Sequence, residues 1–241
     1  RNTVSTLIRD LEEEGLIAMA DANFNAGPVG KDGHTVEQGD CLESIAFQEG
    51  FAWKTLFDLP ENRDLKDARG CHNILLPGDA VHVPDPAVKE VEVPTDTDKH
   101  VFVRSGAQTT ILIRIRNRGK KVEDQPYALT LGEEPEIGMT GAAAEIEATR
   151  NVLEREGSLS LGEEGSEQEF EILLGHLDPI TELSGVKGRL NNLGYDCGSP
   201  DHRENPETTY ALQVFQATHG LKVTGIPDED TRDRLLQVHE N

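Results

Sequence analysis

Basic residues, aromatic residues and cysteines are all scarce in this chain of 241 residues. Only 23 lysines and arginines stand against 45 aspartates and glutamates, so the formal net charge is −22. Phosphate backbones and anionic lipids repel such a chain, which argues against nucleic-acid or membrane-surface partners held by bulk electrostatics. The plainer interpretation of the acidic residues is that they keep a folded protein soluble.

Apolar residues are also limited, at 36% hydrophobic and 5% aromatic. This composition favours several modest cores over one large core, and the length allows two to three small domains. No run of about 18 apolar residues occurs, so we expect no membrane insertion.

The three cysteines, Cys41, Cys71 and Cys197, cannot all pair within one chain. A reducing compartment therefore fits better than a disulfide framework, although Cys41 and Cys71 could approach each other within one module. Residues 1–18 carry charges throughout and lack the apolar core of a secretory signal. We expect synthesis and folding in the cytoplasm.

Residues 1–33 are predicted to be a helix followed by a flexible leader. The helix, over 2–17, carries an apolar stripe and ends near Gly15. It resembles the recognition helix of a winged helix-turn-helix regulator, but the partner helices and the wing are missing, so DNA binding is not expected. Met19 is a plausible natural start, which would make residues 1–18 a remnant, a fusion scar or a docked helix. Glycine, proline and asparagine over 19–33 indicate the leader.

The chain is organised around residues 34–85, which predict a strand, two helices and a strand. Gly39-Asp40 turns the chain after the first strand, and apolar residues then recur at helical spacing from Leu42. A second helix around Trp53 is expected to stop near Pro60. Pro77-Gly78-Asp79 turns into an alternating strand that ends at Pro84.

This βααβ pattern resembles the LysM carbohydrate-binding module. The resemblance implies a sugar groove between the loop after the first strand and the loop before the second. The implied glycan-binding residues are Gly39, Asp40, Cys41, Leu42, Ile74, Leu75, Leu76 and Pro77. Such a groove offers amide hydrogen bonds and an apolar floor to N-acetyl sugars. The alternative is that these residues are simply turns and core edges that the fold requires.

Residues 86–174 change to short alternating runs, which predict a small antiparallel β-sandwich. The runs are 100–103, 109–116, 127–131, 144–148, 158–161 and 169–174. The paired charges of this segment, Arg114 with Arg116 and Glu145 with Glu147, are interpreted as solvated strand faces.

Helical spacing returns over 175–241 and predicts three short helices. Asn205-Pro206 is typical of a helix start, Gly220 of a helix stop, and 228–230 place acidic residues at the head of the last helix. Phe215-Gln216, His219-Gly220-Leu221 and Thr224-Gly225 carry a resemblance to the peptidoglycan-binding-like domain of cell-wall hydrolases. The chain departs from that pattern over 201–206.

No catalytic constellation is found. The sequence has no His-Glu-x-x-His helix, no Gly-x-Ser-x-Gly elbow and no phosphate-binding glycine loop. Cys71 and His72 are adjacent, which points their side chains apart, and a structural turn is the preferred interpretation of Cys197, Asp201 and His202. We expect a binding protein rather than an enzyme, with no metal and no cofactor.

The order of the modules resembles that of non-catalytic proteins associated with bacterial type VI and other contractile injection machines. One function that this implies is peptidoglycan binding as an accessory to such a machine, with delivery to the periplasm or cell wall. The other is an assembly or effector-cargo adaptor that binds a spike or effector protein. The missing signal and the acidity favour the adaptor, whereas the two module families favour the glycan binder.

Overall fold

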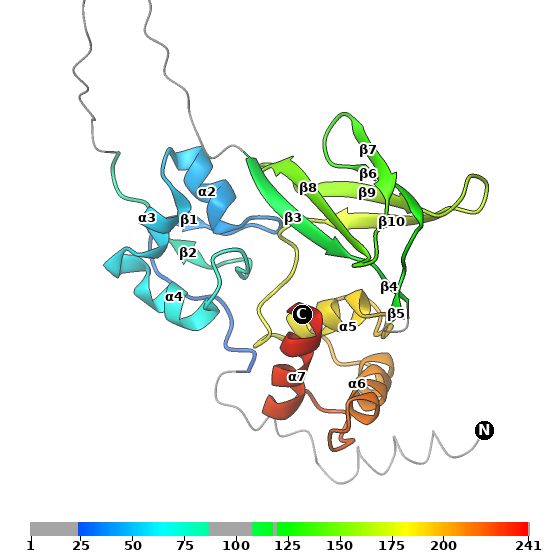
Figure 1. The fold of residues 1–241 in the computed structure, drawn as a ribbon. Helices are drawn as coiled ribbons and strands as arrows, with labels where there is room; N and C mark the ends of the chain where they lie inside the picture. The colour runs from blue at the N-terminus through cyan, green and yellow to red at the C-terminus, as the bar shows by residue number, and fades with distance from the viewer. Residues whose placement is uncertain (1–23, 87–107, 118–119, 241) are drawn as a thin grey trace, which may run out of the picture. The chain divides into compact units, whose positions relative to one another are not determined.

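The structure is a computed structural model that describes residues 24–86, 108–117 and 120–240 (Figure 1). It combines helices with antiparallel sheets, as predicted for an α+β protein. The described residues fall into two compact units. One unit holds 28–86, 108–116 and 121–176, and the other holds 24–27, 117, 120 and 177–240. The expected helix over 2–17 and strand over 100–103 lie outside the described residues.

The first module of the larger unit contains the predicted strand, two helices and strand, with a further helix inserted before the second strand. Its elements are β1 (His34–Thr35), α2 (Leu42–Glu49), α3 (Trp53–Phe57), η1 (Pro60–Asn62), α4 (Arg63–Arg69) and β2 (Ala80–Val81). The two strands pair antiparallel, with His34 opposite Val81. Helix α4 was not predicted, because Pro60 was interpreted as a stop. Here Pro60 is the first residue of a 3₁₀ turn that leads into α4, a position where its missing N–H costs nothing.

Antiparallel sheets build the second module. A two-stranded sheet pairs β3 (Gln108–Arg114) with β8 (Glu145–Asn151). A four-stranded sheet has the order β10 (Gln168–Leu173), β9 (Glu156–Leu161), β6 (Pro126–Thr130), β7 (Pro135–Met139). The short strands β4 (Arg116–Asn117) and β5 (Lys120–Lys121) form a third sheet. Side chains from the two larger sheets share one core, which includes Leu129, Ile146, Ala148 and Leu159.

Strand β7 was not predicted, since it lies at a sheet edge and buries almost none of its own apolar surface. Its Ile137 and Met139 are exposed. At Gly138, an added Cβ would lie 2.6 Å from the Tyr127 hydroxyl oxygen. The ring of Tyr127 therefore occupies the space that a side chain at 138 would fill. A proline and a glycine within five residues are more typical of a turn than of a strand, so the sequence does not indicate this strand.

Three helices form the C-terminal domain: α5 (Leu183–Asn192), α6 (Pro206–Thr218) and α7 (Glu229–Glu240). The predicted start of α6 is confirmed, because the Asn205 side chain accepts a hydrogen bond from the Thr208 N–H at 2.6 Å and Pro206 follows it. Asp228 accepts from the Thr231 N–H in the same way at the head of α7. The core contains Val186, Leu190, Ala211, Leu212, Phe215 and Leu235.

A segment from the other end of the chain completes this core. Phe24 is 8% exposed and packs among the core residues of the three helices. Asn25 donates its N–H to the Thr181 carbonyl at 2.7 Å, and its side chain accepts from the Leu183 N–H at 3.0 Å. The composition of 19–33 had indicated only a flexible leader, whereas residues 24–27 are part of the C-terminal domain.

Candidate functional site

The two loops predicted to form a sugar groove lie together. The Leu42 N–H at the end of the first loop donates to the His72 carbonyl at 3.0 Å, just ahead of the second loop. Of the predicted residues, Ile74 and Pro77 are half-buried and the other six are buried, namely Gly39, Asp40, Cys41, Leu42, Leu75 and Leu76. A ligand at these loops would therefore meet Ile74, Pro77 and backbone atoms.

A buried ion pair that the sequence reasoning missed fixes the second loop. Arg69 at the end of α4 donates to both carboxylate oxygens of Asp79, at 2.8 and 2.7 Å, and both side chains are almost fully buried. Asp79 also accepts from the backbone N–H groups of Leu76 and Val29. The carboxylate is thus paired and hydrogen-bonded, as a buried charge requires. The turn 77–79 had signalled only a strand start.

Asp40 is held by protein groups rather than offered to a ligand. Its side chain is 2% exposed and accepts from the Glu37 N–H at 2.9 Å and from Arg155 Nη2 at 2.6 Å. His34 Nε2 lies 3.3 Å from the same carboxylate. Arg155 belongs to the sheet module, so this contact joins the two modules of the larger unit.

The neighbouring Gly39 lies against the sheet module as well. A Cβ at Gly39 would lie 3.0 Å from Arg155 Cδ and 3.3 Å from His176 Nε2. A Cβ at Gly175 would meet the Gly39 carbonyl oxygen at 2.5 Å. Backbone and side chains of the sheet module therefore cover the first loop, and the open part of the predicted site is its second loop.

An aromatic group lies beside that second loop. The Trp53 and His72 rings stack with centroids 3.8 Å apart and planes 9° apart, and Phe57 meets both edge-on. All three are half-buried. His72 Nε2 lies 3.6 Å from the Glu43 carboxylate. The helical spacing around Trp53 predicted a second helix, and only the fold brings His72 onto the Trp53 and Phe57 rings. A half-exposed aromatic surface of this kind can contact the apolar face of a sugar ring.

In the C-terminal domain, the residues that carry the sequence motif are structural. The fully buried Gln216 side chain donates from Nε2 to Thr224 Oγ1, the Ile226 carbonyl and Thr231 Oγ1, each at 2.9 Å. Its Oε1 accepts from the N–H groups of Thr224 and Gly225, each at 2.8 Å. Gln216 thus connects α6 to the Thr-Gly turn and to α7, which explains why Phe-Gln and Thr-Gly occur together.

Residues 201–206, where the chain departs from the peptidoglycan-binding-like pattern, are hydrogen-bonded to a buried lysine of α5. The fully buried Lys187 donates to Asp201 at 2.6 Å and to the Arg203 carbonyl at 3.1 Å. The hydrogen bond from Lys187 lowers the pKa of Asp201. Burial raises the pKa of the Cys197 thiol to about 11, and this thiol donates to the Lys187 carbonyl. Cys197 and Asp201 are therefore occupied by structural contacts.

Over the described ranges, no group of three or more His, Cys, Asp or Glu side chains could hold a metal ion. The three cysteines are free thiols, so Cys41 and Cys71 do not form a disulfide in this structure. None of the helices in the described part of the chain is long and apolar enough to cross a membrane.

Residues 181–235 match the protein-family model described as "Putative peptidoglycan binding domain". The three C-terminal helices are therefore a peptidoglycan-binding-like domain, as the sequence motif predicted. The match supports a glycan-binding role and suggests peptidoglycan as the partner. No curated protein and no solved structure matches the chain. The LysM resemblance of 34–85 and the association with a secretion machine stay predictions.

The peptidoglycan-binding-like domain exposes one large aromatic side chain among its described residues. Tyr210, on α6, is 61% exposed, and Val223 in the turn before α7 is also exposed. Gln213 and Val214 lie three and four residues further along α6, on the same face as Tyr210. An exposed tyrosine offers a ring face to a sugar and a hydroxyl for hydrogen bonding. Tyr210 is therefore the leading candidate for ligand contact in this domain.

Proposed function

We propose that this protein binds peptidoglycan through its N-acetylglucosamine-containing glycan without catalysing a reaction, as an accessory to a bacterial secretion or injection machine. The observation that carries the proposal is the family match over 181–235. The internal scaffold of that domain is complete, since every polar atom of the buried Gln216 amide has a partner. Tyr210 on its surface supplies a contact for the sugar.

The 34–85 module is proposed as a second glycan contact. Its half-buried Ile74 and Pro77 lie at the open loop, with the Trp53 and His72 rings in the same module. Two weak sites on one chain hold a polymeric ligand more strongly than either site alone, because the second contact is intramolecular. Insoluble peptidoglycan is such a polymeric ligand.

Binding without catalysis is supported by the state of the candidate nucleophiles. A cysteine reacts as its thiolate, and a pKa of about 11 keeps the Cys197 thiol protonated at neutral pH. Cys41 is buried. The His72 ring, next to Cys71 in sequence, stacks on Trp53.

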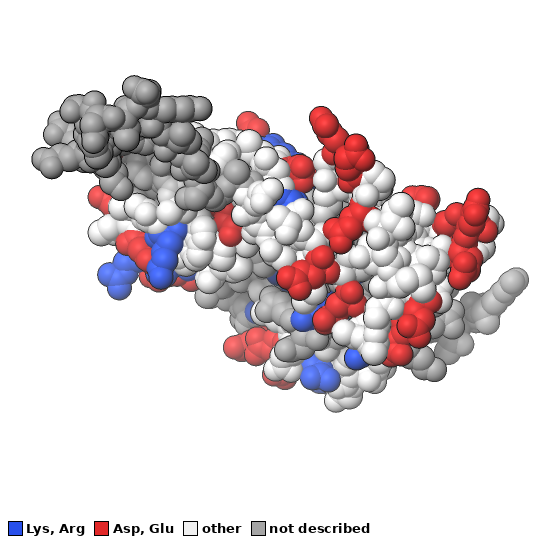
Figure 2. Space-filling view, turned by 45° about the horizontal axis from the view of Figure 1, so that its top comes forward, with Lys and Arg blue, Asp and Glu red and all other residues white. Residues whose placement is uncertain are grey.

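The alternative function is an assembly or effector-cargo adaptor that binds a spike or effector protein. The cover over Gly39 and Asp40 favours it, because contacts from Arg155 and His176 narrow the predicted sugar groove. Acidic side chains are also spread over the face in Figure 2, and they oppose approach to a carboxylate-bearing wall. In either function we propose synthesis in the cytoplasm and delivery to the periplasm or cell wall by the machine.

Co-sedimentation of the full chain with purified insoluble peptidoglycan tests the proposal. We expect the protein in the pellet, with retention that rises or stays constant as salt screens the repulsion between acidic partners. Tyr210→Ala should lower retention several-fold, and Ile74→Asp should lower it less. Leu112→Ala, which removes an exposed side chain from the sheet module, is the matched control. A protein that stays in the supernatant at every salt concentration would exclude the wall-binding function and leave the adaptor.

A further inference from the structure

Among the described residues, strand β10 is an edge of the four-stranded sheet, with no strand paired on its outer side. It pairs with β9 on one side, from Gln168 opposite Leu161 to Leu173 opposite Glu156. Residues 168–171 are all exposed, and Phe170 is 45% exposed. On the other side of β10, no backbone hydrogen bond to another described segment is found. An edge with free N–H and C=O groups can accept a further strand.

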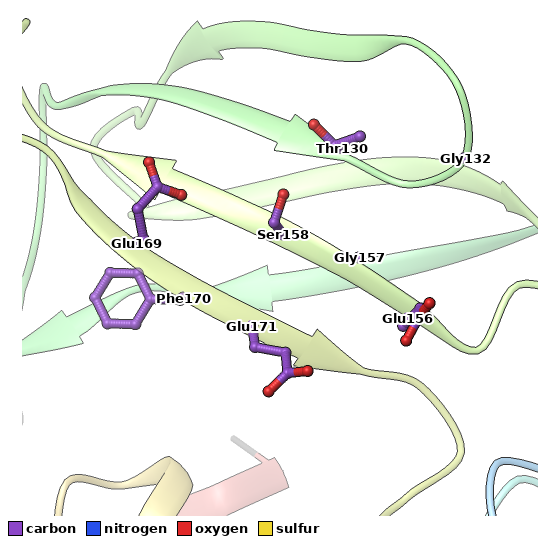
Figure 3. Close-up of a pocket in the computed structure, with 8 residues that line it drawn as sticks. All are labelled: Thr130, Gly132, Glu156, Gly157, Ser158, Glu169, Phe170 and Glu171. Atoms are coloured by element: carbon purple, nitrogen blue, oxygen red, sulfur yellow. The ribbon is translucent and has the colours of Figure 1, made fainter.

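A pocket of about 530 Å³ lies over the face of the sheet beside this edge, across β6, β9 and β10 (Figure 3). It is lined by Thr130, Gly132, Glu156, Gly157, Ser158, Glu169, Phe170 and Glu171. Thr130, Ser158 and Glu171 lie directly opposite one another on β6, β9 and β10, so they form one row on one face of the sheet. The floor is made of small side chains, which leaves room for the side chains of an added strand.

The charge of this edge is of one sign. The side chains of Glu156, Glu169 and Glu171 have no hydrogen-bond or ion-pair partner in the part of the chain that the structure describes. Arg155 is the sole base between 154 and 171, and it is engaged by Asp40. The acidic residues of the same hairpin are Glu154, Glu156, Glu163, Glu164, Glu167, Glu169 and Glu171. A complementary partner must therefore be cationic.

We propose that β10 receives an added strand from a basic, extended segment of another protein. The backbone of that segment hydrogen-bonds to the open edge, its lysine or arginine side chains pair with Glu169 and Glu171, and an apolar side chain packs on Phe170. A second copy of this chain would bring two acidic edges together, and the antiparallel register centred on Phe170 would place Glu169 opposite Glu171. A glycan would leave the backbone edge unused. The proposal does not rest on peptidoglycan binding.

The test uses the full chain and a fluorescent peptide of alternating lysine and valine, as long as the six residues of β10. Fluorescence anisotropy should report binding that weakens as salt rises. The double variant Glu169→Lys/Glu171→Lys should lower the affinity about tenfold, as expected when two exposed ion pairs become repulsive. The matched control is Glu163→Lys/Glu164→Lys, which makes the same charge change in the hairpin turn outside the pocket. It should lower the affinity for the peptide about twofold or less.

Two further readouts separate strand addition from charge attraction alone. Hydrogen–deuterium exchange should show protection of 168–173 on peptide binding, and a peptide methylated on alternate backbone nitrogens should not bind. Absence of peptide binding would mean that the edge glutamates only prevent aggregation, and it would overturn the proposal. Equal losses in the two double variants, or protection elsewhere than β10, would overturn it as well.

Discussion

In the peptidoglycan-binding-like domain and in the 34–85 module, a buried polar side chain connects several backbone segments, but the two side chains differ in charge. Gln216 is neutral and connects three segments through its amide. Asp79 is charged and is balanced by Arg69. Only the domain around Gln216 matches a family model. The comparison teaches that a recognisable motif can mark the residues that hold a fold rather than those that touch a ligand.

The two regions also differ in what they expose. The C-terminal domain presents Tyr210 on an open helix face. The first loop of the 34–85 module is covered by Arg155 and His176 of the sheet module. A ligand can therefore reach Tyr210 of the C-terminal domain more easily than the first loop of the 34–85 module. The variants below break each region separately, and Trp53, the single tryptophan of the chain, reports on the 34–85 module by its fluorescence.

Arg69→Met is expected to lower the stability of the 34–85 module more than any other variant lowers the stability of its region. It leaves the carboxylate of Asp79 buried without its cation, which typically costs about 3 to 5 kcal/mol. The Trp53 fluorescence transition in urea should move to much lower concentration, while exchange protection of α6 stays unchanged. Arg63→Met, an exposed arginine at the start of α4, is the control. An unchanged Trp53 midpoint would show that the ion pair does not stabilise the module.

Gln216→Leu should instead destabilise the C-terminal domain, lowering its free energy of unfolding by about 2 to 4 kcal/mol, and leave the 34–85 module unchanged. The change leaves buried backbone N–H groups of the Thr-Gly turn unpaired, and each such group costs about 1 to 3 kcal/mol. Hydrogen exchange in α6 and α7 should rise while the Trp53 transition is kept. Gln213→Leu, three residues earlier on α6 and half-buried, should change exchange little. Equal behaviour of the two variants would contradict the role given to Gln216.

Acid should weaken the C-terminal domain before the 34–85 module. Burial, with a smaller contribution from Arg189, lowers the pKa of His239 to about 4. The folded domain keeps His239 neutral while the unfolded chain takes up a proton below about pH 6.5. The free energy of unfolding is therefore unaffected by His239 above about pH 6.5 and falls toward pH 4 by at most about 1.4 kcal/mol per pH unit, and by less because solvent screens this partly exposed ring. Burial lowers the pKa of His219 too.

The measurement is the free energy of unfolding of the C-terminal domain between pH 7 and 4.5, in the parent protein and in His239→Gln. Glutamine keeps an acceptor for the Asn192 amide, which lies 3.1 Å from His239 Nε2. The variant should lose less stability with acid than the parent. Parallel pH profiles would contradict a depressed pKa at His239.

Arg155→Ala is expected to cause the smallest loss of stability, about 1 kcal/mol or less in the free energy of unfolding. Arg155 is partly exposed, and Asp40 keeps its bond from the Glu37 N–H. Exchange of the 37–42 backbone should nevertheless rise, because the cover over the first loop is removed. Arg116→Ala, an exposed arginine of the same unit, is the control. If exchange of 37–42 is unchanged, Arg155 does not hold the two modules together.

Regular elements were predictable from the sequence because local signals specify them. The start of α6 follows from Asn205 and Pro206, and most strands of the sheets follow from alternating apolar residues. Strand β7 was missed because its Pro135 and Gly138 are more typical of a turn, and the sequence does not show that Tyr127 of the paired strand β6 fills the space beside Gly138. Helix α4 was missed because a proline both ends one element and begins the next.

The candidate site was less predictable, since burial depends on contacts between distant segments. The sequence brings attention to Asp40, but the contact from Arg155, which lies 115 positions later, decides that its carboxylate faces protein. In the same way, Phe24 lies in a glycine-rich leader and still packs into the C-terminal core. Neither pairing leaves a local pattern, so sequence reasoning found the loops and missed what covers them.

Hydrogen exchange of the full chain, with and without soluble peptidoglycan fragments, tests whether the domain at 181–235 binds peptidoglycan. We predict protection on α6 around Tyr210, lost in Tyr210→Ala and retained in Leu112→Ala. Exchange that is unchanged throughout 181–235 at saturating fragment concentration would contradict the claim.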